Sequence, residues 1–485
     1  MKRPLPLHRP ALAALAACAA LLAGCAAGPD YKKPQVDMPV AWTIEPPWRE
    51  SSPDDAAVKG PWWQRFGDPQ LDALQAQALA NSPTLQLASA RLTQARAQLA
   101  GASSAVFPQV GLGARAQRLK VSENRPLTNY STPNFSTVQD DYALTLSVSY
   151  EADLFGRVQR SIEGARASAQ QSAIDLENTR LVLTADLATA YFTLRGLDAD
   201  LDALDRSIAL QRRALEYVSS RHDLGAASGL EVAQQQALID NTLVQVDVTR
   251  RQRSQFEHAI ATLTGTAAPL FALAPDLKDV KEPAIPLGVP SDVLERRPDV
   301  ASAERAMAAA NAQIGVATAA FYPSIIIGPQ IGFDTRSFGN LFDASSLLWS
   351  LGVSATQTIF DGGRIRANVD FTRAGYDATV ANYRRVVLTA MQEVEDGITG
   401  LAALDRASAQ SQRAIASSRR VLDLATSRYE GGATTYLDVI NAQQSLLGIE
   451  RQATQLQSQR RVTSVFLVKA LGGDWQPEQR IGSSR

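Results

Sequence analysis

The chain has 485 residues, 20% of them charged and 45% hydrophobic, which suits two or three ordinary domains or one long repeat architecture. Its 48 basic and 49 acidic residues leave a net charge of −1, which argues against nucleic acid as a partner. Because Cys18 and Cys25 are the only cysteines, a disulfide framework and a cysteine-rich metal site are excluded.

The first 25 residues have the pattern of a bacterial secretory signal. A basic start precedes the apolar run 11–23, which is too short to span a membrane. The run ends in Leu21-Leu22-Ala23-Gly24-Cys25, which resembles a lipobox. This resemblance implies cleavage before Cys25 and acyl chains on its thiol and new amino group. The next residue is Ala26 rather than Asp, which resembles the pattern of lipoproteins sorted to the outer membrane. An ordinary signal peptide with an incidental cysteine is the alternative.

The sequence also contains an internal repeat. Phe107-Pro108 matches Tyr322-Pro323 at a spacing of 215 residues, and residues 221–232 match 428–439 without gaps at a spacing of 207. The first copy therefore holds about eight extra residues, which we place in the segment 121–139 because a difference confined to one loop leaves the scaffold intact.

Proline placement divides the chain further. No proline lies between Pro133 and Pro269 or between Pro329 and Pro477, and interior prolines break helices, so long helices are expected there. We predict a signal peptide at 1–24, a lipid-anchored extended strap at 25–69, repeat 1 at 70–265, a proline-rich connector at 266–290, repeat 2 at 291–473 and a C-terminal tail at 474–485. Repeat 1 has the expected order helix, two strands, long helix, helix.

A heptad pattern occupies the first proline-free region. Apolar residues recur every seven positions at Leu187, Leu194, Leu201, Ile208 and Leu215, and a second series lies three residues later at Ala190, Leu197, Leu204 and Val218. Together they form the seam, in which the polar residue Gln211 is the exception. Such spacing is typical of coiled-coil packing. It predicts one helix from about residue 157 to 222, near 100 Å long at roughly 1.5 Å per residue. The second copy keeps Val394, Leu401, Ile415 and Leu422.

Each repeat also holds two segments in which apolar and polar residues alternate. These segments are 110–115 and 142–150 in the first copy, and 325–333 and 347–356 in the second, where Ile326 and Pro329 interrupt the alternation in 325–333. Past Ala23 no apolar stretch reaches about 18 residues, so any membrane crossing must be made by strands. The alternation is typical of a membrane β-barrel, and a half-buried strand in a soluble sheet is the alternative.

Four strands cannot close a barrel, because about eight is the smallest useful number. Several chains must therefore contribute strands to one barrel. Two chains would give a lumen filled by side chains and three would leave room for a passage, and the periodicity does not choose between them.

Taken in order, six motifs resemble the TolC-like outer-membrane efflux proteins, specifically the lipidated NodT/OprM-like branch that serves resistance-nodulation-division pumps. The motifs are Gly28-Pro-Asp-Tyr-Lys-Lys-Pro34, Trp62-Trp-Gln-Arg-Phe66 with Asp68-Pro69, Tyr150-Glu-Ala-Asp-Leu-Phe-Gly-Arg157, Leu294-Glu-Arg-Arg-Pro-Asp-Val300, Ala319-Ala-Phe-Tyr-Pro-Ser324 and Phe360-Asp-Gly-Gly-Arg364. A single tetrapeptide is weak evidence for a family, but the ordered set is highly specific. The resemblance covers nearly the whole mature chain.

The resemblance implies an α+β membrane protein. It implies a homotrimer with a twelve-stranded barrel, four strands per chain, continuous with a twelve-helix periplasmic α-barrel and an equatorial domain. It also implies a lipid-anchored location in the outer membrane, extending into the periplasm, with a periplasmic adaptor protein and an inner-membrane pump as partners. The implied function is a passive, gated conduit for drugs and small toxic compounds. No cofactor is expected beyond the acyl chains on Cys25.

The matched segments 221–232 and 428–439 are predicted to be the tips of two helical hairpins. Gly225 and Gly432 suit the left-handed residue that ends a helix. Ser228 with Glu231, and Thr435 with Asp438, have the spacing of capping boxes, and capping alone accounts for much of the pattern. Arg221 and Arg428 lie in the preceding turns, where a cation meets the negative end of the helix dipole. By resemblance, the tips dock an adaptor through Arg221, Gly225, Ser228, Leu230, Arg428, Gly432 and Thr435.

The resemblance further implies a periplasmic gate in the second hairpin. Leu437 matches an apolar constriction residue, and Asp438 and Asn441 match positions where relatives carry constricting carboxylates. Asp438 and Asn441 are three residues apart and so share a helix face. Relatives often have Asp where this chain has Asn441, so the acidic part of the gate is reduced. Asp438 as a helix-start residue is the alternative.

The mature chain offers no recognisable catalytic group. His222 and His258 lie 36 residues apart without metal-ligand spacing or a nucleophile signature, and Gly111-Leu-Gly113 lacks the third glycine of a dinucleotide loop. We therefore predict a protein that is not an enzyme and holds no metal. The rival functions are the channel of a protein-secretion exporter and a structural periplasmic coiled-coil lipoprotein.

Overall fold

The computed structural model describes residues 27–33, 61–120, 138–278 and 297–473. These residues fall into two compact units. Unit 1 comprises the described parts of 1–34, 93–171 and 304–382, and unit 2 those of 35–92, 172–303 and 383–485. Several predicted features lie outside the described residues: the signal peptide, Cys25, most of the strap, residues 121–137 of the loop with the extra residues, residues 279–290 of the connector and the C-terminal tail. Among the helices of the described ranges, none combines the length and the apolar character needed to cross a membrane.

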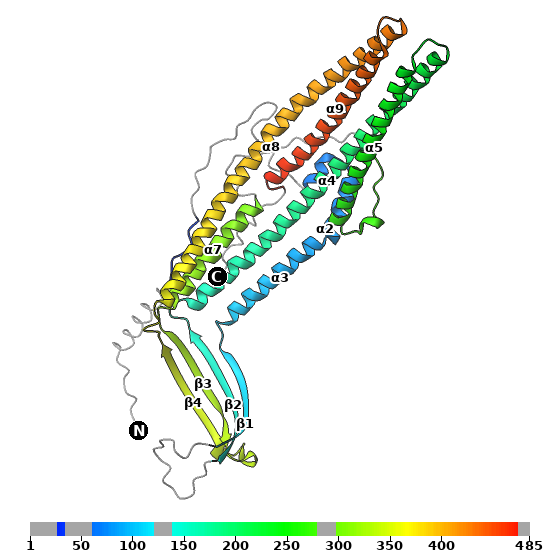
Figure 1. Cartoon of the computed structure of the whole chain (residues 1–485). Helices are drawn as coiled ribbons and strands as arrows, with labels where there is room; N and C mark the ends of the chain where they lie inside the picture. The colour runs from blue at the N-terminus through cyan, green and yellow to red at the C-terminus, as the bar shows by residue number, and fades with distance from the viewer. Residues whose placement is uncertain (1–26, 34–60, 121–137, 279–296, 474–485) are drawn as a thin grey trace. The chain divides into compact units, whose positions relative to one another are not determined.

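Unit 1 contains a four-stranded antiparallel sheet with the order β1-β2-β3-β4 (Figure 1). The strands are β1 Gln109–Lys120, β2 Val138–Ala152, β3 Ser324–Thr335 and β4 Leu347–Thr356. All four segments with alternating residues are strands, so that prediction is confirmed. The central pairing of β2 with β3 joins strands from the two halves of the sequence.

The register separates the sheet into two chemically different faces, because successive side chains of a strand point to opposite sides. Leu112 is opposite Leu146, and Ile331 is opposite Trp349, on one face. The other face places small or polar residues opposite one another, as in the pairs Gly111–Ser147, Gly113–Thr145 and Gln330–Ser350. On the apolar face, Leu112 is 71% exposed and Trp349 is 74% exposed. A continuous apolar surface of this kind marks an interaction or membrane site.

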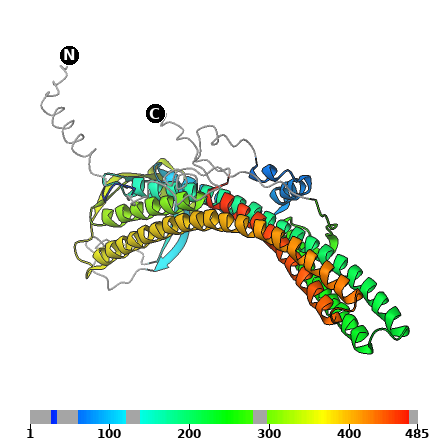
Figure 2. The ribbon, with the colours of Figure 1, turned by 90° about the horizontal axis from the view of Figure 1, so that it is seen from above.

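Long helices form most of the remaining structure. They are α2 Pro69–Asn81, α3 Pro83–Ser104, α4 Arg157–Asp223, α5 Gly229–Leu263, α7 Pro298–Ala319, α8 Arg364–Glu430 and α9 Tyr436–Ala470. The helix predicted from about 157 to 222 is confirmed as α4. In both views of the ribbon, α5 lies beside α4 and α9 lies beside α8 (Figures 1 and 2).

The main hydrophobic core of unit 2 is built on the predicted seam. Leu187 and Leu194 of α4 are fully buried in it with Val394 of α8 and Leu467 of α9. Gln211, the polar exception in the seam, is also buried. Its backbone carbonyl accepts a hydrogen bond from the Gln235 side chain at 2.9 Å. The Gln211 side-chain amide donates a hydrogen bond to the Ser207 hydroxyl at 3.1 Å, so this buried polar side chain is satisfied in part.

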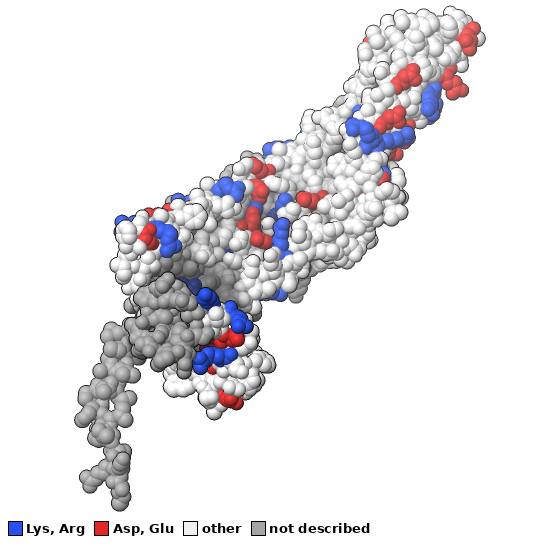
Figure 3. Space-filling model, turned by 60° about the horizontal axis from the view of Figure 1, so that its bottom comes forward, with Lys and Arg blue, Asp and Glu red and all other residues white. Residues whose placement is uncertain are grey.

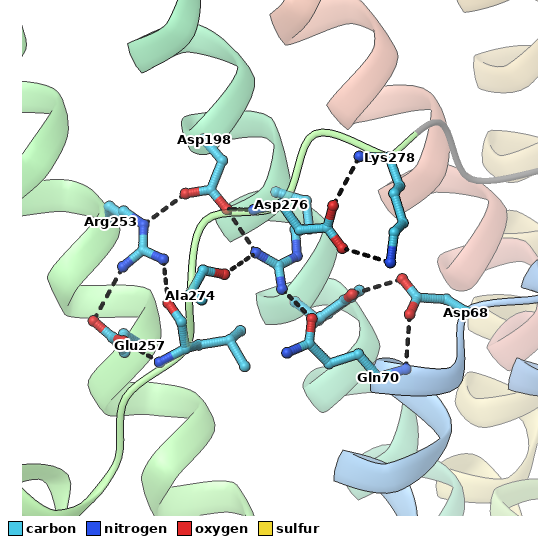
Figure 4. A network of polar contacts seen from close by, with 11 residues as sticks. Asp68, Gln70, Asp198, Arg253, Glu257, Ala274, Asp276 and Lys278 are labelled. Atoms are coloured by element: carbon cyan, nitrogen blue, oxygen red, sulfur yellow. Dashed lines mark hydrogen bonds and ion pairs between the residues drawn. The ribbon is translucent and has the colours of Figure 1, made fainter.

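A buried network of charged residues fastens the extended segment after α5 to the helices (Figure 4). Asp198, whose side chain is 0% exposed, receives hydrogen bonds from Arg195 at 2.7 Å and from Arg253 at 2.6 Å. Arg195 also donates to the carbonyl of Ala274 at 2.8 Å, and Arg253 donates to that of Leu273 at 2.5 Å. Both guanidinium groups thus hold the segment, while Asp198 and Glu257, which lies 3.2 Å from Arg253, compensate their charge.

The same network continues to the start of α2 (Figure 4). Asp68 caps α2 by accepting a hydrogen bond from the Gln70 backbone N–H at 2.9 Å, and it also accepts one from the Tyr191 hydroxyl at 2.6 Å. Burial, together with the hydrogen bond to Asp68, raises the pKa of Tyr191. Its hydroxyl therefore stays protonated and available as a donor at neutral pH.

Candidate functional site

The candidate site is the pair of hairpin tips in unit 2. Hairpin 1 consists of α4, the turn 224–228 and α5, and hairpin 2 consists of α8, the turn 431–435 and α9. Gly225 has φ 74° and Gly432 has φ 70°, so the prediction of left-handed residues is confirmed at both positions. A side chain at either glycine would strain the backbone.

Each helix that enters a turn ends in the same hydrogen-bonded pattern. In hairpin 1, Ala226 N–H donates to the Arg221 carbonyl and Gly225 N–H donates to the His222 carbonyl, both at 2.8 Å. In hairpin 2, Ala433 N–H donates to the Arg428 carbonyl at 2.8 Å. This is the Schellman arrangement, which satisfies the last carbonyls of a helix. Arg221 and Arg428 lie in the final turns, as predicted.

The predicted capping boxes hold only in part. Ser228 accepts a hydrogen bond from Glu231 N–H at 3.4 Å, as expected of a cap, but the Glu231 carboxylate binds Tyr429 instead of returning to Ser228. Thr435 is the N-cap residue of α9, as predicted, but the predicted capping box is wrong there, because the Thr435 side chain makes no capping hydrogen bond. The physical reason is that the neighbouring Thr434 hydroxyl donates to the Asp438 carboxylate, which engages the residue expected to close the box.

Two tyrosines connect hairpin 2 to hairpin 1. The Tyr429 hydroxyl donates to Glu231 of α5 at 2.6 Å, and the Tyr436 hydroxyl donates to Gln235 of α5 at 2.8 Å. The two rings lie 4.9 Å apart, centroid to centroid. Arg221 of α4 lies over the Tyr429 ring, 5.0 Å from its centroid. The tips are therefore held together by two hydrogen bonds and by one contact between a cation and an aromatic ring.

The two hydroxyl donors are stable in their protonated form. Burial and the hydrogen bond to Glu231 raise the pKa of Tyr429 to about 12. Burial also raises the pKa of Tyr436, and the charge of Glu231 adds to this effect. A small apolar cluster surrounds the rings and contains Val218, Leu238, Val439 and Ile440. Both links are thus shielded from water on one side.

The predicted gate residues lie on the opposite, exposed face of α9. Leu437, Asp438 and Asn441 are all exposed, and the Leu437 side chain is 50% exposed. The adjacent residues Tyr436, Val439 and Ile440 are buried, so α9 presents one face to hairpin 1 and the other to solvent. Leu230, the counterpart of Leu437 in hairpin 1, is 66% exposed. The structure brings the gate residues together on one face, and their role as a gate stays a prediction.

The links between the hairpins are not predicted from the sequence. The spacing of Glu231 from Ser228 predicts only a capping role, and the predicted site does not include Tyr429, Tyr436 or Gln235. Two tyrosines on either side of a helical turn are the one signal present in the sequence. Their partners lie 198 and 201 residues away, and no spacing rule pairs residues at that distance. Within the described residues, no group of His, Cys, Asp and Glu side chains is placed to hold a metal ion.

Comparison with known proteins assigns the chain to a family. The family model described as outer membrane efflux protein matches residues 74–266 and again 289–473. The toluene efflux pump outer membrane protein TtgF of Pseudomonas putida is 32% identical over 465 residues, which cover 94% of this chain and 95% of that protein. The pyoverdine export outer membrane protein OpmQ of Pseudomonas aeruginosa is 30% identical, with coverage of 97% and 98%.

The solved structures agree with this assignment. The outer-membrane channel OprN has a TM-score of 0.85 and 29% identity, covering 93% of this chain and all of that one. The fold is therefore that of TolC-like outer-membrane channels, as the sequence motifs predict, and proteins with this fold and family are conduits rather than enzymes. The chain belongs to the outer membrane efflux protein family and is an outer-membrane efflux channel protein.

Proposed function

We propose that three copies of the chain form a gated channel that exports drugs and other small toxic compounds. In this proposal the channel is lipid-anchored in the outer membrane and works with a periplasmic adaptor and an inner-membrane resistance-nodulation-division pump. The observation that carries the proposal is the four-stranded sheet of unit 1, with one exposed apolar face and one polar face. Because β1 and β4 are edge strands of the described sheet, further copies can continue it. Twelve strands are the smallest such set with room for a passage.

Aromatic residues near both ends of the strands support the membrane placement. At one end, Tyr142 packs against Phe338 with ring centroids 5.7 Å apart, and Phe338 is 70% exposed. At the other end, Phe155 stacks on Tyr322 at 4.8 Å, and Tyr322 is 46% exposed. Membrane barrels carry aromatic residues in this way at both lipid–water interfaces.

The segment that follows Cys25 supports the proposed lipid anchor. Ala27 N–H donates to the Phe155 carbonyl at 2.9 Å, and the buried Arg160 side chain donates to the Ala27 carbonyl at 3.2 Å. Gly28 lies so close to Gly315 that an added Cβ would meet the Gly315 Cα at 2.5 Å. Acyl chains attached at Cys25 would thus be tethered to the same unit as the sheet.

For the gate, we propose that Leu437, Asp438 and Asn441 of each copy narrow the channel mouth. Their shared exposed face on α9 leaves them free to project into a lumen. The links of Tyr429 and Tyr436 to α5 hold hairpin 2 in this position. An adaptor that binds the tips would open the mouth by separating hairpin 2 from hairpin 1.

Truncation of the gate leucine is expected to enlarge the mouth. In single-channel recordings, Leu437→Ala should raise conductance by about two-fold or more, because three apolar side chains leave the constriction. Asp438→Ala should lower the preference for cations, because it removes negative charge from the mouth. The matched control is Leu230→Ala, since Leu230 occupies the same position in hairpin 1. Unchanged currents in the variants at 437 and 438 would count against the gate.

Small-molecule export is favoured over the rival functions. The related proteins are named for the export of toluene and of pyoverdine, which are small compounds. A purely structural periplasmic lipoprotein would not account for the exposed apolar face of the sheet. The secretion of proteins has no support among these names.

The proposal is tested in cells that lack their own channel of this family. Expression of the chain with its cognate adaptor and pump should reduce the accumulation of a fluorescent pump substrate. The control expresses the chain without the adaptor, and efflux should then be lost. Unchanged accumulation with the complete set, despite the chain being present in the outer membrane, would refute an efflux role.

A further inference from the structure

The polar face of the sheet carries its charge at the two ends of the strands. Over most of its length this face holds small, uncharged residues such as Gly113, Thr145, Gly332 and Ser350. At the end next to the helices it carries Glu151, which forms an ion pair with Arg157 at 2.5 Å. The remaining charged residues on this face of the four strands are Arg115, Asp141 and Asp334, all toward the opposite end.

These three residues come together from three neighbouring strands, and we call them the charged cluster. Arg115 of β1 lies 2.8 Å from a carboxylate oxygen of Asp141 of β2 and 3.9 Å from one of Asp334 of β3. Gln117 also donates a hydrogen bond to Asp141 at 2.7 Å. Two carboxylates share one guanidinium, so the cluster contributes one net negative charge from each chain.

Within the cluster the negative charge is only partly compensated, and Asp141 is mostly buried while its two partners are half exposed. The second carboxylate oxygen of Asp141, Oδ1, is buried without a hydrogen-bond partner in the structure. The side chains of Arg115 and Asp334 are 55% and 48% exposed. Beside the cluster lies a cavity of about 410 Å³ whose lining includes Asp141, Asp334 and Arg336. With this end of the structure turned forward, acidic and basic side chains lie close together on the surface (Figure 3).

We propose that the charged cluster is a filter that sets the charge preference of the channel at the end of the sheet remote from α3. This proposal rests on the proposed function, in which the polar face lines the conducting path. Arg115, Gln117, Asp141 and Asp334 lie together at this end, whereas the middle of the face is mostly Gly, Ser and Thr with Gln330 as an exception, so the charged end holds a concentration of longer side chains. A narrow passage with low-dielectric walls focuses the field and enriches counter-ions. The three net negative charges of a trimer therefore favour cationic solutes.

The test is the reversal potential of reconstituted channels in a potassium chloride gradient. Arg115→Gln removes the positive charge and should raise the ratio of potassium to chloride permeability by about two-fold, the size expected for one unit charge near a water-filled path. Asp334→Asn should lower the ratio by a similar factor. The matched control is Arg118→Gln, because Arg118 lies on the same strand but on the opposite face and its side chain is 74% exposed. The control should leave the ratio unchanged.

The salt concentration and a replacement variant provide two further checks. Both shifts should shrink in 1 M salt, where the screening length falls from about 10 Å at 0.1 M to about 3 Å. If Arg115→Gln or Asp334→Asn fails to assemble, Asp141→Asn takes its place and should act as Asp334→Asn does. Channels that conduct with unchanged selectivity in these variants, or with the same shift in Arg118→Gln, would overturn the filter alone. Wild-type protein that never conducts would overturn the proposed channel and the filter together.

Discussion

Channels in which Tyr429 and Tyr436 are both replaced by Phe are expected to open far more often than wild-type channels. The substitutions keep the packed rings and remove the two hydroxyl groups that bind Glu231 and Gln235 at 2.6 and 2.8 Å. A hydrogen bond contributes about 1 kcal/mol net, and about 1.5–3 kcal/mol when one partner is charged. Loss of both should thus shift the balance between closed and open mouths by about 2.5–4 kcal/mol, which is a factor of roughly 10² to 10³.

Single-channel recording without adaptor measures this shift as an increase in open time. Tyr217→Phe is the matched control, because Tyr217 also lies near Arg221 at the hairpin tip but is 44% exposed. It should behave as the wild type does. If the double variant stays closed as often as the wild type, the tyrosine links do not restrain the gate.

The second large effect concerns stability. Asp198→Ala should lower the free energy of unfolding by about 3–5 kcal/mol, because it leaves the buried Arg195 guanidinium without a carboxylate and leaves Arg253 with Glu257 alone. The extended segment held through Leu273 and Ala274 should loosen at the same time. Thermal unfolding in detergent, followed by circular dichroism, measures the loss.

Asp202→Ala provides the control for this experiment. Asp202 lies one turn further along α4 and pairs with Arg206, but the Arg206 side chain is 60% exposed. Exposed pairs contribute little to stability, so the melting temperature should stay close to that of the wild type. Equal losses in the two variants would show that burial of the Asp198 network is not what stabilises this region.

Much of the fold could be predicted because its local signals are strong. The proline-free stretch and the heptads predicted a helix from about 157 to 222, and α4 runs from Arg157 to Asp223. Alternation of apolar and polar residues located all four strands. Gly225 and Gly432 were identified because few other residues adopt a left-handed conformation without strain.

The parts that escaped prediction depend on contacts between distant residues. Arg195 and Asp198 are three residues apart on a helix, a spacing that surface ion pairs share, and only tertiary packing buries them. Likewise, the sequence offers Ser228 as the local partner of Glu231, but the Glu231 carboxylate binds Tyr429, which lies 198 residues away. At Thr435 the N-cap position was right, but the hydroxyl of the neighbouring Thr434 engages Asp438.

The central claim is that strands from several copies of this chain enclose a water-filled path through the outer membrane. Planar-bilayer recording of the purified wild-type protein tests it most directly. We expect discrete conductance steps, each marking the insertion of one assembled channel. The variant that lacks both tyrosine hydroxyls should stay open for longer. Folded protein that inserts into the bilayer and passes no ions, even in that variant, would contradict the claim.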